Sequence, residues 1–181
     1  YASDATIVCI GMRASGKTHV GRALATRLGR AFVDADEVFA QKHDLRAFVA
    51  EHGWARFREE ETALLAQLLK AHPTGHVLAL GGGVVETEAS RALLQSYAAS
   101  GPVVHVVRSL DAILAFLATS DRPAYGEPVE DVYARRLPYY AACSSVEVFN
   151  GPNTDTVEVL VRQLAAPLGL AVPVDLSPEH A

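Results

Sequence analysis

Cysteine is scarce in this chain, which has only Cys9 and Cys143 among its 181 residues. Two widely separated cysteines give no disulfide framework, and no metal-ligand spacing of cysteine and histidine accompanies them. The seven histidines are scattered, and we interpret them as surface or packing residues. This pattern suits a reducing compartment, so we expect a cytoplasmic protein without a cysteine-based metal site.

The chain also lacks long apolar runs and an excess of positive charge. No apolar run reaches transmembrane length, and neither a signal peptide nor an internal repeat is visible. The 16 Lys and Arg residues are outnumbered by 21 Asp and Glu residues, which gives a formal net charge of -5 at pH 7. This balance argues against nucleic acid or a membrane surface as a partner.

Methionine occurs once, at Met12, and none precedes Tyr1. We therefore expect a chain that is processed, tagged or cut from a longer polypeptide. Half of the residues are hydrophobic and a fifth are charged, which is typical of a globular protein. The length suits one domain with a proper core, and we expect residues 1–169 to form it and residues 170–181 to be a tail or linker.

One stretch matches the phosphate-binding pattern G-x-x-x-x-G-K-[ST] without a mismatch. It consists of Gly11, Met12, Arg13, Ala14, Ser15, Gly16, Lys17 and Thr18. A β-branched apolar run at 6–10 precedes it, and apolar residues at helical spacing follow it, so the order is strand, loop, helix. Backbone N–H groups and a helix dipole would then meet a polyphosphate, with Lys17 on the outer phosphates and Thr18 on Mg²⁺. The alternative is a chance match in an ordinary strand-turn-helix.

Two further groups of residues follow predicted strands. Asp34 and Asp36 come after a strand at 30–33, and their spacing predicts one shared side of an extended segment, suited to metal and substrate. The alternative is an N-cap for a helix that begins near Glu37. Gly81, Gly82 and Gly83 come after a strand at 77–80, where glycines allow close backbone approach to a ligand.

Arginines are prominent in the remaining segments. Arg58 and Glu61 lie three apart on a predicted helix and can pair. Arg122 lies in a polar, proline-containing loop. Two interpretations of this loop are open: a mobile cover over the site, or an ordinary surface loop. A helix predicted at 129–142 carries Arg135 and Arg136, and Pro138 should kink or shorten it.

Five short strands alternate with helices along the chain. They are predicted at 6–10, 30–33, 77–80, 102–107 and 146–149, and a helix follows most of them. This order predicts an α/β fold in which a five-stranded parallel sheet lies between helices, with right-handed crossovers. The phosphate loop, the aspartates and the glycine triplet should therefore meet along one rim of the sheet.

Taken together and in order, these motifs resemble the shikimate kinase family from about Ile7 to Pro152. They are the phosphate loop, D-x-D, F-R-x-x-E, G-G-G, R-P and R-x-P-x-Y, and several local sequences look most like the kinase domain of the fungal pentafunctional arom polypeptide. The resemblance implies a three-layer P-loop fold like that of nucleoside monophosphate kinases. It implies a substrate-binding region at about 37–62 and a lid at about 119–129. It also implies covalently linked neighbouring domains of the shikimate pathway.

The resemblance also implies an activity and residue roles. The activity is ATP-dependent phosphorylation of the 3-hydroxyl of shikimate. Lys17, Asp36 and Arg122 would be catalytic, and Asp36 would orient or deprotonate the acceptor hydroxyl. Thr18 and Asp34 would hold Mg²⁺. Arg58, Arg136 and the backbone of Gly81 to Gly83 would hold shikimate, and the turn at Pro152 would flank adenine. Arg135 is the neighbouring alternative to Arg136, which the proline spacing favours.

Two other functions remain open at this point. One is a related small-molecule kinase, for gluconate or a nucleoside monophosphate, although those kinases lack F-R-x-x-E together with R-x-P-x-Y. The other is a non-catalytic shikimate- or quinate-sensing regulatory domain. Retention of Lys17, Asp34, Asp36, Arg58, Arg122 and Arg136 favours the kinase over the sensor.

Overall fold

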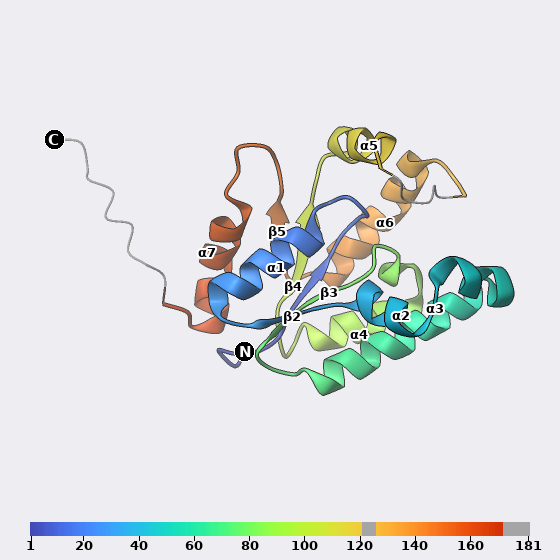
Figure 1. The fold of residues 1–181 in the computed structure, drawn as a ribbon. Helices are drawn as coiled ribbons and strands as arrows, with labels where there is room; N and C mark the ends of the chain where they lie inside the picture. The colour runs from blue at the N-terminus through green and yellow to red at the C-terminus, as the bar shows by residue number, and fades with distance from the viewer. Residues whose placement is uncertain (121–125, 172–181) are drawn as a thin grey trace.

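A five-stranded parallel sheet forms the centre of the fold (Figure 1), which a computed structural model describes for residues 1–120 and 126–171. The strands are β1 (Ile7–Ile10), β2 (Ala31–Asp34), β3 (His76–Ala79), β4 (Val103–Val107) and β5 (Val146–Phe149), in the order β2-β3-β1-β4-β5. All four strand pairings are parallel. The predicted α/β class and parallel sheet are confirmed, and each predicted strand lies within one residue of an observed one.

Helices cover both faces of this sheet. They are α1 (Lys17–Leu28), α2 (Ala35–Lys42), α3 (Leu45–Ala71), α4 (Glu88–Tyr97), α5 (Leu110–Ala118), α6 (Val129–Cys143) and α7 (Thr156–Leu168), with a short 3₁₀ turn η1 (Val84–Glu86). No helix among the described residues is both long enough and apolar enough to cross a membrane.

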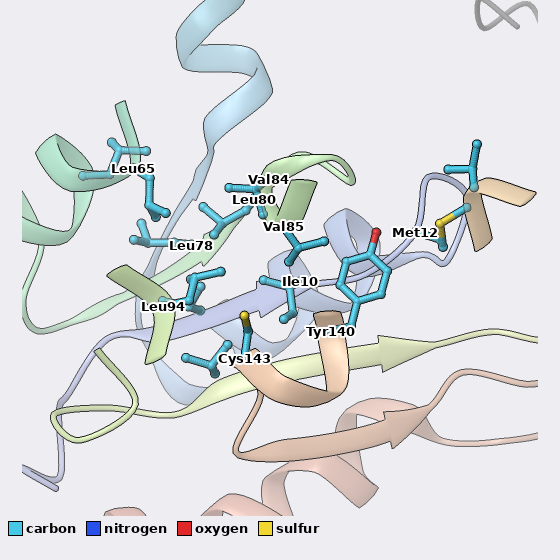
Figure 2. Packing of buried hydrophobic residues seen from close by; sticks show 14 of the residues in the cluster. Ile10, Met12, Leu65, Leu78, Leu80, Val84, Val85, Leu94, Tyr140 and Cys143 are labelled. Atoms are coloured by element: carbon cyan, nitrogen blue, oxygen red, sulfur yellow. The ribbon is translucent and has the colours of Figure 1, made fainter. Parts of the chain in front are cut away.

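Two clusters of buried apolar residues lie between the sheet and its helices, one on each face. Side chains along β1 point alternately to the two faces and so belong alternately to the two clusters. Ile7 and Cys9 pack with α1 and α7, whereas Val8 and Ile10 pack with α3, α4 and α6. Figure 2 shows the second cluster, in which Tyr140 lies beside Ile10. Successive strand residues point to opposite faces, so a strand buried on both sides must be apolar throughout, as β1 is.

Two residues that disfavour helix lie inside helices of this fold. Gly53 has φ 83° and ψ 166° inside α3, a backbone conformation that glycine adopts readily. Pro138 was expected to kink or shorten its helix, but α6 continues through it to Cys143, so shortening is wrong. Tyr140 and Cys143 lie buried beyond the proline, and this packing offsets the lost hydrogen bond.

Candidate active site

The phosphate loop joins β1 to α1 and has a strongly constrained backbone. Gly11, Ala14 and Gly16 have φ values of 155°, 67° and 87°, and the side chain of Lys17 is buried and donates to the Met12 carbonyl at 3.2 Å. No side chain caps the start of α1 at Gly16. The first-turn N–H groups of α1 therefore form an anion-binding end of the kind that binds phosphate.

Two residues outside the motifs support this loop through hydrogen bonds to its backbone carbonyls. Arg108 donates to the Ala14 carbonyl at 2.8 Å, and Asn150 donates through Nδ2 to the Ser15 carbonyl at 2.9 Å. A Cβ on Gly16 would collide with the Asn150 amide. Arg108 follows β4 and Asn150 follows β5. Residues at the carboxyl ends of parallel strands commonly line the ligand site, so this position could have identified both from the sequence.

Asp34 links the loop to α2. Its Oδ2 accepts a hydrogen bond from Thr18 Oγ1 at 3.1 Å, while its Oδ1 accepts from the backbone N–H groups of Asp36 at 2.9 Å and Glu37 at 3.3 Å. The expectation that Asp34 and Asp36 share one side of an extended segment is wrong, because α2 begins at Ala35 and Asp36 lies in its first turn. The N-cap alternative is confirmed for Asp34, and the same carboxylate also reaches the loop.

The glycine triplet after β3 is where the other predicted site residues meet. A Cβ on Gly81 would lie 2.7 Å from Asp36 Oδ1, and one on Gly83 would collide with the Arg58 guanidinium. A Cβ on Gly82 would lie 3.0 Å from the Arg13 backbone nitrogen and 3.5 Å from Arg136 Nη1. Three elements and the phosphate loop therefore converge on this backbone, and the absent side chains make the approach possible.

Arg58 is oriented by its neighbours on α3. Its Nη1 donates to Glu61 Oε1 at 2.8 Å, so the predicted pair is confirmed. Burial raises the pKa of Glu61, although the charge and hydrogen bond of Arg58 oppose that rise. The guanidinium also lies over the rings of Phe57 and Trp54, at 5.3 and 5.6 Å from their centroids. These contacts fix Arg58 beside the triplet.

The two neighbouring arginines on α6 have different surroundings. Arg136 is 4% exposed, and its Nε donates to Glu86 Oε1 at 2.7 Å. Arg135 is exposed and makes two hydrogen bonds to Glu127, at 2.8 and 2.6 Å, as well as contacting Glu86. Of the two, Arg136 is the one whose Nη1 lies beside Gly82 of the triplet, at 3.5 Å from where a Cβ would be.

A pocket opens between α2, α3 and the triplet. Its walls include the carboxylates of Asp36 and Glu61, the Gly81 backbone and the rings of Phe39 and Phe57. An apolar pocket with a few convergent polar groups is typical of a small-molecule site. Of the remaining predicted residues, Pro152 lies exposed in the turn after β5, and Arg122 lies outside the described residues.

Comparison with known proteins extends this description. A family model described as shikimate kinase matches residues 13–165. The pentafunctional AROM polypeptide of Malassezia globosa is 59% identical over 175 residues, which are 96% of this chain and 11% of that protein. That of Mycosarcoma maydis is 56% identical over 153 residues, covering 82% of this chain and 9% of that protein.

Among solved structures, the shikimate kinase of Acinetobacter baumannii in complex with shikimate has a TM-score of 0.75 at 26% identity, covering 91% of this chain and 93% of that one. The fold and the phosphate loop are thus those of the P-loop kinase class. Within that class, the chain belongs to the shikimate kinase family. It spans about a tenth of the length of the curated relatives that it matches.

Proposed function

We propose that this chain transfers the γ-phosphate of ATP to the 3-hydroxyl of shikimate, giving shikimate 3-phosphate and ADP. One observation carries the proposal: Asp36, Arg58 and Arg136, from three separate helices, meet at a glycine triplet whose middle residue abuts the phosphate loop. An acceptor bound there lies beside the place where a nucleotide's phosphates bind.

The acceptor half of the site suits a small hydroxylated acid. Arg58 and Arg136 offer two guanidinium groups, whose planar donors match a carboxylate in a bidentate arrangement. Asp36 supplies a carboxylate that accepts a hydrogen bond from the hydroxyl and orients or deprotonates it. Apolar walls from Phe39 and Phe57 suit the face of a carbocyclic ring.

The nucleotide half of the site rests on the phosphate loop. Lys17 and the loop amides, from Gly11 to Thr18, hold the β- and γ-phosphates, and the turn at Pro152 flanks adenine. Thr18 and Asp34 fit Mg²⁺, because their oxygen atoms already lie 3.1 Å apart and Mg²⁺ is usually held by one or two carboxylates together with substrate phosphates. When bound, Mg²⁺ supplies positive charge to the phosphate oxygens.

Phosphoryl transfer requires positioning and charge stabilisation more than covalent chemistry by the protein. The buried Lys17 places one positive charge at the loop, and the proposal assigns a second to Arg122 as catalytic residue. An arginine in that role contributes about 10³–10⁵ in rate in other phosphoryl-transfer enzymes. The proposal includes a lid at about 119–129, of which 121–125 lie outside the described residues, and its role is to exclude water from the transferring phosphate.

The wider setting belongs to the same proposal. The similarity to AROM polypeptides supports covalently linked neighbouring domains of the shikimate pathway in the full-length chain. Two free, buried cysteines support a reducing, cytoplasmic setting. Residues 1–169 form the kinase domain.

A coupled assay of ADP release with and without shikimate tests the function. We expect shikimate to accelerate ADP release in the presence of Mg²⁺, and Lys17→Ala and Asp36→Asn each to reduce kcat by at least 10²-fold. Arg56→Ala is a control on the exposed side of α3, where Arg56 pairs with Glu59 and Glu60. Affinity for shikimate without turnover would instead indicate a sensor, and acceleration by gluconate or a nucleoside monophosphate alone would indicate another kinase.

A further inference from the structure

We propose that Glu86 is a positioning residue for shikimate recognition, which acts by holding Arg136 in the orientation that meets the substrate carboxylate. This inference rests on the proposed function and assigns a role to a residue that no motif singled out. Glu86 ends η1, three residues after the last glycine of the triplet. The segment that begins with the glycine triplet, proposed to contact shikimate by its backbone, therefore also supports Arg136, one of the two arginines proposed to bind the carboxylate.

The contact geometry carries the argument. Glu86 Oε1 accepts from Arg136 Nε at 2.7 Å, a distance typical of a strong charge-assisted hydrogen bond. Holding Nε fixes the plane of the guanidinium, and that plane decides whether its Nη atoms can meet both oxygens of a carboxylate. Nη1 of the same group lies beside Gly82, at 3.5 Å from where a Cβ would be.

A second arginine completes the arrangement. Both oxygens of Glu86 lie 3.2 Å from Arg135 Nε, and Arg135 in turn donates to both oxygens of Glu127. Glu86 is thus held from two sides and cannot rotate freely around its bond to Arg136. Burial raises the pKa of Glu86, but the hydrogen bonds and charges of Arg136 and Arg135 outweigh burial and lower it, so the group is ionised at neutral pH.

Electrostatics and positioning predict opposite effects of removing Glu86. A negative charge next to Arg136 weakens the attraction of Arg136 for an incoming carboxylate, so electrostatics alone predicts tighter shikimate binding without it. Loss of the hydrogen bond to Nε predicts weaker binding, because the arginine side chain regains rotamer freedom that binding must then restrict. The sign of the change in affinity therefore separates the two.

The test compares Glu86→Ala and Glu86→Gln with the wild type, by steady-state kinetics and by calorimetric titration with shikimate. We expect Glu86→Ala to raise KM and Kd for shikimate about tenfold or more, while KM for ATP stays unchanged and kcat falls less than threefold. Glu86→Gln keeps an oxygen acceptor and should restore most of the affinity. The methyl ester of shikimate, which lacks the charge, should lose far less affinity in Glu86→Ala.

Glu158→Ala is the matched control, because Glu158 Oε1 accepts from Arg27 Nε at the same 2.7 Å on the opposite side of the fold. It should leave both shikimate constants unchanged. A Glu86→Ala protein with shikimate constants equal to or below those of the wild type, or with an equal loss for ATP, overturns the role of Glu86. A wild-type protein that neither binds nor phosphorylates shikimate overturns the proposed function instead, and the inference with it.

Discussion

The absence of a side chain at Gly83 leaves space for the guanidinium of Arg58 in the candidate site. The guanidinium of Arg58 lies where a side chain on residue 83 would be, although the φ of Gly83 is -91° and any residue could adopt it. The requirement at position 83 is therefore space for the neighbouring arginine and not backbone freedom. A substitution there tests the arginine without touching it.

We expect Gly83→Ala to raise KM for shikimate about tenfold while leaving the fold intact, because the new methyl group displaces Arg58. Arg58→Ala should show a loss of shikimate affinity of the same kind. The double variant should be no worse than Arg58→Ala alone, since the methyl group then has nothing to displace. Steady-state kinetics of the three variants measures this, and additive losses would contradict it.

His105 gives the stability of the fold a dependence on pH. It is buried on β4, where its ring stacks on Tyr140 with centroids 4.9 Å apart. Burial lowers the pKa of His105, and the nearby Glu147 carboxylate opposes that shift only in part. The folded state therefore favours the neutral imidazole of His105. The neutral ring contributes fully to the free energy of unfolding above the unfolded-state pKa of about 6.5, and this contribution is lost as pH falls below about 6.5.

Urea unfolding at pH 7.5 and at pH 5.0 measures this contribution. The wild type should lose more free energy of unfolding between the two conditions than His105→Leu does. His19→Leu, at an exposed position on α1, should keep the slope of the wild type. Equal slopes in His105→Leu and the wild type would show that the buried imidazole does not titrate on unfolding.

The N-cap residue of helix α2, Asp34, also contacts the phosphate loop. Asp34 caps the helix through Oδ1 and contacts Thr18 through Oδ2. Asparagine caps helices about as well as aspartate but carries no charge. The two roles can therefore be separated by choosing the substitution.

We expect Asp34→Ala to lower the free energy of unfolding by about 1 kcal/mol relative to the wild type, and Asp34→Asn to change it little. Both variants should need more Mg²⁺ for half-maximal turnover, because both lose the carboxylate charge. Urea unfolding measures the first effect and a Mg²⁺ titration of turnover the second. Equal stability of the Ala and Asn variants would mean that the cap contributes nothing.

The elements of this fold follow from local sequence, and much of the site does not. Strand positions and the phosphate loop could be predicted because apolar runs and glycines act over a few residues. The first-turn position of Asp36 was missed because an N-cap at Asp34 competes with extension of the strand. The support from Glu86, Arg108 and Asn150 was missed because it depends on contacts between residues 50 to 135 positions apart.

The whole molecule has one thiol on each face of its sheet. Cys9 packs in the cluster with α1 and α7, and Cys143 packs in the cluster with α3, α4 and α6. Burial raises the pKa of Cys9 to about 12, against the opposing charge of Lys17, and burial also raises the pKa of Cys143. Both groups are therefore poor nucleophiles in the folded state.

We expect an aromatic disulfide reagent at pH 8 to label neither thiol while the domain is folded. In increasing urea, both should react with the same midpoint, because the two clusters share the central strands and unfold as one unit. Single Cys9→Ser and Cys143→Ser variants assign each signal, and fully unfolded protein gives the complete count. Early labelling of Cys143 alone would show that α6 opens independently.

Asp34 caps α2 and, under the proposed function, also holds a metal, so two kinds of natural selection would act on one side chain. A duplicated copy of this domain that had given up phosphoryl transfer would still be penalised for changing residue 34, since α2 would fray. The pressure on residue 36 would relax in the same copy. Among descendants of such a domain, a substitution of Asp36 would therefore indicate loss of phosphoryl transfer more clearly than a substitution of Asp34. Asp34 would be retained in any lineage that keeps the fold.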